Sequence, residues 1–277
     1  MHRAILTVSS DFGRDGPYVA AMKGVVLGLA PDTQIVDVSH AIAPQNVLEG
    51  AFVLAGIVDA FPPGTVHLAV VDPGVGTERR LIAVSVAEQW FVAPDNGLLG
   101  GVVRDRDVTG IWEITNPSLW RTRVSSTFHG RDILAPAAAH LLLGRDPNEL
   151  GPRRSKLITL TNFEPRSDHS GLVGEVIFRD AFGNLITNVS ASRLAPTSPE
   201  NWSIEIAGET IDGLNRTYGD KPPGTIVAVV GSCGWVEIAI VNGDAARTLT
   251  AGPGMTVWFR RKLVTVVRSA ERQLVAV

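Results

Sequence analysis

The chain has 277 residues, of which 45% are hydrophobic and 19% charged, and its formal net charge is −3. This balance is typical of a folded globular chain and gives no reason to expect a nucleic acid partner. Cys233 is the single cysteine, and no apolar stretch approaches the roughly 20 residues of a membrane span, so we expect a cytoplasmic protein without disulfides or membrane contact.

The first half of the chain alternates between strand-type and helix-type segments. Strands are predicted at 4–9, 34–39, 65–72, 81–86 and 90–93, and helices at 17–30, 46–60 and 131–144. Strands that alternate with helices are typical of a mainly parallel sheet flanked by helices. We therefore predict an α/β domain over residues 1–150.

The composition changes near residue 145, where Pro, Gly and charged residues become frequent. We interpret 151–170 as a linker. The remainder contains short β-type runs between turn residues and lacks a helical stripe; the runs are GEVIF, NLITNV, WSIEIAG, TIVAVV, WVEIAIV, MTVWFR and LVTVV. This pattern predicts a small all-β domain over 171–277, either an antiparallel barrel or a sandwich.

Polar clusters follow several predicted strands or lead into a helix. They are SSDFGRDG (9–16), DVSH (37–40), VDPGVGTERR (71–80), APDNGLL (93–99) and SSTFHGRD (125–132). Ligands of open α/β sheets bind outside the carboxyl ends of the strands. The acids, an arginine and a histidine of these clusters are therefore expected to converge at one edge of the sheet.

Each candidate residue also has a structural interpretation. Asp11, Asp72 and Asp95 stand beside Gly or Pro and are typical of turns. His40 is typical of a hydrogen-bonded structural histidine, and His129 is suited to cap the helix that follows it. The chain lacks HExxH, P-loop, GxGxxG and GxSxG patterns, which argues against a zinc protease, an NTPase, a Rossmann dehydrogenase and a serine hydrolase.

Seven motifs, taken in order, resemble one family: SSDFG, DVSH, VDPGVGTERR, APDNGLL, TFHGRD, DAFGNLITN and GSCGWVEIA. Together they resemble the S-adenosyl-L-methionine (SAM) hydroxide adenosyltransferases, which are related to the SAM-dependent fluorinase and chlorinase. The resemblance covers nearly the whole chain. It implies hydrolysis of SAM to adenosine and methionine, by attack of water-derived hydroxide on ribose C5′, with no cofactor and no metal.

The resemblance assigns the activation of water to Asp72, Arg79 and His129. Methionine leaves a sulfonium as a neutral thioether, so the demanding step is to form hydroxide from water, whose pKa is about 15.7. We expect Arg79 to supply positive charge and His129 and Asp72 to accept or relay the proton. The neighbouring Arg80 stays an alternative to Arg79.

The same resemblance separates hydroxide from halide chemistry. The halogenases carry Tyr at the position of Asp72 and lack the histidine of TFHGRD. An acid at position 72 would repel a halide, so the residues favour hydroxide as the nucleophile.

The resemblance also implies a set of substrate-binding residues. Asp11 is expected to bind the ribose hydroxyls, and Asp95 and Asn96 to line the ribose side or brace the pocket. Asp180 and Asn184 are expected at the amino-acid end of methionine, with Asn188 as a weaker candidate. Ser232 and Cys233 are expected to give backbone contacts to adenine and the methionine carboxylate. One position departs from the family pattern. The family usually has an acid five residues after Asp11, whereas this chain has Gly16 there, and the nearest acid is Asp15.

The resemblance implies a homotrimer with each active site between the α/β domain of one subunit and the β domain of its neighbour. A cleft within one chain would divide the residues in the same way. Two functional alternatives remain: a SAM-dependent halogenase, and a SAM- or adenosine-binding protein with little turnover.

Overall fold

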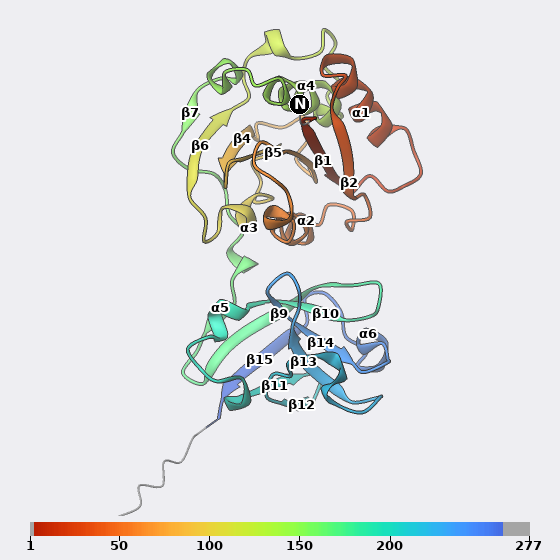
Figure 1. Cartoon of the computed structure of the whole chain (residues 1–277), viewed down its shortest axis with the longest axis vertical. Helices are drawn as coiled ribbons and strands as arrows, with labels where there is room; N and C mark the ends of the chain where they lie inside the picture. The colour runs from red at the N-terminus through yellow and green to blue at the C-terminus, as the bar shows by residue number, and fades with distance from the viewer. Residues whose placement is uncertain (1–2, 263–277) are drawn as a thin grey trace, which may run out of the picture. The chain divides into compact units, whose positions relative to one another are not determined.

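The structure is a computed structural model that describes residues 3–262. The chain divides into two compact units, Met1–Phe163 and Glu164–Val277 (Figure 1). None of the helices within 3–262 combines the length and apolar character needed to cross a membrane.

The first unit is built on one seven-stranded sheet with the order β2-β1-β3-β5-β4-β6-β7. Its strands are β1 (Ile5–Ser10), β2 (Gln34–Ser39), β3 (Val66–Val70), β4 (Leu81–Val86), β5 (Gln89–Pro94), β6 (Val108–Glu113) and β7 (Arg153–Arg154). Its helices are α1 (Tyr18–Leu29), α2 (Val47–Ala55), α3 (Gly100–Val103) and α4 (Ala135–Leu142). Single helical turns add Val58–Ala60, Pro117–Leu119, Pro147–Leu150 and Thr161–Phe163.

The sheet is mixed, so the prediction of a mainly parallel sheet describes only part of it. β1 pairs in parallel with β2 and β3, and β3 pairs in parallel with β5. β4 pairs antiparallel with β5 and β6, and β6 pairs antiparallel with β7. Only Ala87 and Glu88 separate β4 from β5, and a parallel connection needs a dozen or more residues.

Helices cover both faces of this sheet. Alternate residues of β3 divide between two cores: Leu68 and Val70 pack with residues of α1 and α4, whereas Ala69 packs with residues of α2 and α3. All five residues of β3 are buried, as expected for a central strand with both faces covered. The carboxyl end of β3 is therefore fixed by packing on both faces, and Asp72 stands two residues beyond it.

The segment predicted as a linker, 151–170, contributes short elements to both units. β7 pairs with β6, and Phe163 packs on Phe52 of α2 with ring centroids 4.6 Å apart. β8 (Arg166–Ser167) pairs with β9 of the second unit.

The second unit contains a barrel-like antiparallel sheet with the order β12-β11-β15-β9-β10-β14-β13, and β8 joins at β9. Its strands are β9 (Gly171–Arg179), β10 (Leu185–Ser190), β11 (Trp202–Ile206), β12 (Glu209–Asp212), β13 (Ile226–Val230), β14 (Trp235–Ile240) and β15 (Thr256–Arg261). Asn215, just after β12, forms a bridge with Val229 of β13, which brings the two ends of the sheet together. The predicted run LVTVV (263–267) lies outside the described residues.

The second unit also contains helical turns that the sequence did not predict. They are α5 (Ala191–Leu194), α6 (Ala245–Thr248), Pro199–Asn201 and Tyr218–Asp220. Ala245 and Ala246 of α6 are buried and pack on the core that contains Trp202 and Phe259. These turns connect the strands, and the hydrophobic core of this unit is still formed mainly by residues of the β strands.

His67 of β3 lies in the core of the first unit as a neutral ring with both nitrogens hydrogen-bonded. Gln89 donates to two backbone carbonyls, so its oxygen faces His67 Nε2 at 2.8 Å, and Thr7 Oγ1 lies 2.7 Å from Nδ1. The side chain is 0% exposed, and this burial lowers the pKa of His67 from 6.5 to about 4.

We expect this histidine to make stability depend on pH. Between about pH 6.5 and 4 the unfolded chain binds a proton at His67 that the folded chain does not, so the free energy of unfolding falls as the pH falls, by about 3 kcal/mol in total. Urea unfolding at several pH values should show a shallower fall for His67→Gln than for the wild type. If the free energy of unfolding fell equally with pH in the two proteins, His67 would not be the source of the pH dependence.

Candidate active site

Asp72, Arg79 and His129 come together although 50 residues separate the last two in the chain. Arg79 Nε donates to Asp72 Oδ1 at 2.7 Å and Arg79 Nη2 donates to Asp72 Oδ2 at 2.5 Å. Arg79 Nη2 also lies 3.1 Å from His129 Nδ1. The Asp72 and Arg79 side chains are only 5% and 10% exposed, so this ion pair is largely withdrawn from water.

The loop after β3 is shaped by glycines that allow this approach. Gly76 has a φ of 80°, and a Cβ there would lie 2.6 Å from the carbonyl oxygen of Ser126. Thr77 Oγ1 donates to Gly74 O at 2.7 Å and closes the turn. The close packing of 72–79 on Ser126 places Arg79 beside the segment that carries His129.

The contact with Arg79 determines which nitrogen of neutral His129 carries the proton. A guanidinium offers only donors, so Nδ1 accepts from Arg79 and the proton resides on Nε2. Burial lowers the pKa of His129 and the charge of Arg79 lowers it further, while Asp72 and Asp132 act in the opposite direction. His129 is therefore neutral near pH 7, with an N–H on Nε2 available to a bound molecule.

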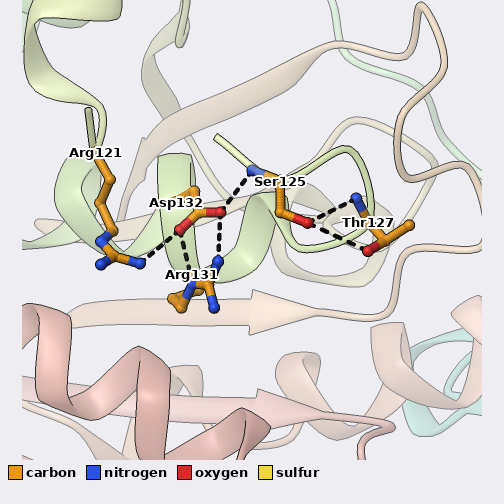
Figure 2. A network of polar contacts seen from close by, with 5 residues as sticks. All are labelled: Arg121, Ser125, Thr127, Arg131 and Asp132. Atoms are coloured by element: carbon orange, nitrogen blue, oxygen red, sulfur yellow. Dashed lines mark hydrogen bonds and ion pairs between the residues drawn. The ribbon is translucent and has the colours of Figure 1, made fainter. Parts of the chain in front are cut away.

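Asp132 holds the segment around Ser125, which leads to His129, and Figure 2 shows its contacts with Arg121, Ser125 and Arg131. Arg121 and Arg131 donate to its Oδ1 at 3.0 and 2.7 Å, and the Ser125 N–H donates to its Oδ2 at 2.9 Å. Burial would raise the pKa of Asp132, but the hydrogen bonds from Arg131, Ser125 and Arg121 outweigh it and lower the pKa to about 2. Sequence reasoning missed this residue, although it stands three positions after His129 in the same motif.

Pro136 explains how the backbone around Asp132 is held. Proline has no N–H to donate to the carbonyl four residues earlier, and that carbonyl of Asp132 instead accepts from Arg121 N at 3.0 Å. The helix begins with a π-helical turn, Gly130–Leu134, before α4. The start of this helix is thus tied to residue 121 by both main chain and side chain.

Arg80 has partners other than His129. Its guanidinium pairs with the buried carboxylate of Asp95, whose Oδ1 accepts from Ile158 N at 2.7 Å. Asn96 donates to Val71 O at 2.8 Å, next to Asp72. In this structure Asp95 and Asn96 hold together the segments at the ends of β3 and β5.

Asp11 lies in a loop held by His40. The carboxylate of Asp37 accepts from His40 Nε2 at 2.9 Å, so His40 Nδ1 accepts from Ser10 Oγ at 2.8 Å. The His40 carbonyl accepts from Gly13 N at 2.9 Å. His40 is therefore a hydrogen-bonded structural histidine, and it fixes the loop on both sides of Asp11.

The two carboxylate oxygens of Asp11 differ in their contacts. Oδ2 accepts from Gln45 N at 2.8 Å, and Oδ1 has no partner within residues 3–262. The rings of Phe12, Tyr18 and Phe128 pack together with centroids 5.5 to 5.8 Å apart. Phe12, which follows Asp11, and Phe128, which precedes His129, therefore belong to the same aromatic cluster.

Four candidates of the second unit lie in two turns, and the fifth, Asn188, lies in β10. Asp180 follows β9 and accepts from Asn184 N at 2.8 Å and from Asn184 Nδ2 at 2.9 Å, so the two side chains hold one turn together. Ser232 and Cys233 are exposed in the turn between β13 and β14. Asn188 is buried and accepts from Glu175 N at 2.9 Å.

Asp15 and Gly16 are exposed beside Tyr18 in the first unit.

Residues 3–262 contain no group of three or more His, Cys, Asp or Glu arranged to hold a metal ion. The polar centre of the first unit consists instead of one carboxylate, one guanidinium and one imidazole. Such a set combines a fixed positive charge with a carboxylate acceptor and an imidazole N–H donor, and it is suited to orient and polarise a small polar molecule.

Domain-level comparison defines the class of protein. Residues 6–151 match the family described as SAM hydroxide adenosyltransferase N-terminal domain, and residues 174–258 match the C-terminal domain of the same name. The chain belongs to the SAM hydroxide adenosyltransferase family.

Individual relatives are of two kinds. The chain is 40% identical to an (R)-S-adenosyl-L-methionine hydrolase of Salinispora tropica, over 90% of this chain and 95% of the relative, and 39% identical to the (R)-S-adenosyl-L-methionine hydrolase of Thermus thermophilus, over 90% and 96%. It is 29% identical to a fluorinase of Nocardia brasiliensis, over 92% and 96%. A crystal structure of an uncharacterized conserved protein from Thermotoga maritima superposes with a TM-score of 0.83 at 34% identity, over 93% of this chain and 100% of that one.

Proposed function

We propose that this protein hydrolyses SAM to adenosine and methionine. The observation that carries the proposal is the partly buried Asp72–Arg79–His129 centre, in a chain that matches both domains of the SAM hydroxide adenosyltransferase family. In the reaction, a water oxygen forms a bond to ribose C5′ while the C5′–S bond breaks and its electron pair passes to sulfur. The sulfonium becomes a neutral thioether, so the leaving group needs no proton.

The geometry suggests a division of roles around the attacking water. Both oxygens of Asp72 accept from Arg79, and each keeps a further lone pair that can take a proton from water. The Nδ1 lone pair of His129 is used by Arg79, so His129 offers its Nε2–H to the water oxygen. We therefore assign proton acceptance to Asp72, orientation to His129 and stabilisation of the nascent hydroxide to Arg79.

Substrate binding is proposed for residues of both units. Asp11 would accept from the ribose hydroxyls through its unpaired Oδ1, and Asp95 and Asn96 would brace the strand ends behind the ribose. Asp180 and Asn184 would bind the amino-acid end of methionine, with Asn188 as a weaker candidate. The turn that holds Ser232 and Cys233 would contribute backbone contacts to adenine and to the methionine carboxylate.

We further propose a homotrimer in which each site combines the first unit of one subunit with the second unit of a neighbour. This follows the family assembly, and the candidate residues divide between the two units accordingly. Light scattering that gave the mass of a single chain would contradict it.

Incubation with SAM in oxygen-18 water tests the function. We expect the label in the 5′-hydroxyl of adenosine and none in methionine, because water attacks carbon and not sulfur. A parallel reaction in high chloride should still give adenosine. Chlorinated adenosine would instead indicate a halogenase, and calorimetric binding of SAM without methionine release over hours would indicate a binding protein.

A further inference from the structure

A cavity of about 740 Å³ lies between α1, α4 and residues 118–123 of the first unit. It is lined by the carboxyl-terminal half of α1, by Pro136, Ala139 and His140 of α4, and by Leu143 and Arg145 after it. None of Asp72, Arg79, His129 or Asp11 lines it. Cavities of about 300 to 1,000 Å³ are typical of sites for small molecules. This one is separate from the proposed reaction centre.

Two glycines on α1 form one wall of the cavity. Gly24 and Gly28 stand one helical turn apart, and a Cβ at either position would meet no atom within 4 Å. Glycine within a helix is less stable than alanine. Packing does not require glycine at these positions, so their effect is to keep the cavity open.

The charge of the cavity is positive, although the chain as a whole is negative. Arg121, Arg123 and Arg145 line it, and no lining residue is acidic. Arg121 pairs with Asp132, whereas Arg123 and Arg145 have no carboxylate partner within residues 3–262. Two unpaired guanidinium groups beside one cavity favour an oxyanion.

Two further lining side chains carry a polar atom without a partner. His140 is 3% exposed; its Nε2 donates to Asp146 O at 3.0 Å, and its Nδ1 is buried without a hydrogen bond. Trp120 Nε1 is likewise buried without an acceptor. Polar atoms of this kind are rare in folded proteins because each lost hydrogen bond costs stability.

We propose that this cavity binds a small organic oxyanion, a phosphate or carboxylate on an apolar body. Arg123 and Arg145 would bind the charged group, and Val25, Leu119 and Leu143 would pack on the apolar part. The site does not depend on SAM hydrolysis, because it shares none of the residues assigned to that reaction.

Isothermal titration calorimetry with phenyl phosphate, benzoate and inorganic phosphate tests the proposal. We expect one saturable site per chain for phenyl phosphate or benzoate, tighter than for inorganic phosphate, weakened by added salt and unaffected by saturating adenosine. The stronger of the two organic probes identifies the charged group. Absence of saturable binding, or competition by adenosine, would overturn the proposal.

Variants then locate the site. Gly28→Leu should abolish binding by placing a bulky side chain in the part of the cavity beside α1. Arg123→Ser and Arg145→Ser should each weaken binding about tenfold, which is the size expected for one charge-assisted hydrogen bond. Arg166→Ser removes the same charge from the exposed strand β8 and should bind as the wild type does. All four variants should hydrolyse SAM normally, which reports that they are folded. Full binding by Gly28→Leu would place the anion elsewhere.

Discussion

Replacing His129 by alanine should lower kcat for SAM hydrolysis by about 10²-fold or more, with little change in the affinity for SAM. The imidazole lies 3.1 Å from Arg79 and presents Nε2–H to the site, so its loss removes a group that orients the attacking water. Methionine release gives kcat, and calorimetry with SAM gives the affinity. His169→Ala is the matched control, because His169 is exposed in the second unit.

Two conservative variants show which nitrogen of His129 matters. Asparagine places an oxygen near the position of Nδ1, so His129→Asn keeps an acceptor for Arg79 but has nothing at Nε2. Glutamine places an amide N–H near the position of Nε2. If the Nε2–H orients water, His129→Gln should retain more activity than His129→Asn. Wild-type turnover by His129→Ala would remove the residue from the mechanism.

Strand order predicted that polar segments would gather at one edge of the sheet, and the family resemblance then singled out Asp72, Arg79 and His129 among them. Asp72 follows a buried central strand, and polar residues at the carboxyl ends of such strands meet at one edge. The motif position favoured Arg79 over Arg80, and in the structure Arg79 contacts His129 while Arg80 pairs with Asp95. Successive side chains of an extended backbone point in opposite directions, and only packing decides which one faces His129.

Other features depended on contacts between distant residues. The mixed sheet arises from the short β4–β5 connection, a spacing that was visible in the sequence but was outweighed by the strand–helix alternation before it. The role of Asp132 required knowledge that Arg121 lies beside it, where Arg121 N donates to the carbonyl of Asp132 and the Arg121 guanidinium donates to its carboxylate. The cavity beside Gly24 and Gly28 could not be predicted, because the spacing of residues in the sequence does not show where side chains leave space unfilled.

The largest effect on stability and activity is expected when one partner of the Asp72–Arg79 ion pair is replaced by an uncharged residue. Asp72→Asn leaves a guanidinium that is 10% exposed without its carboxylate, and Arg79→Met leaves the carboxylate without its partner. Each single change should lower the free energy of unfolding by about 3 to 5 kcal/mol, because an uncompensated charge remains in a poorly solvated place. Each should also lower kcat by more than about 10²-fold, since one removes the proton acceptor and the other the positive charge.

The double variant Asp72→Asn/Arg79→Met separates stability from catalysis. It removes both charges, so it should be more stable than the sum of the single changes predicts while remaining as inactive as either. Urea unfolding measures the first quantity and methionine release the second. Arg154→Met serves as the control, because the Arg154–Glu113 pair has a 42% exposed arginine and should contribute less than about 1 kcal/mol. Activity that returned together with stability in the double variant would show that the pair holds the loop and takes no part in activating water.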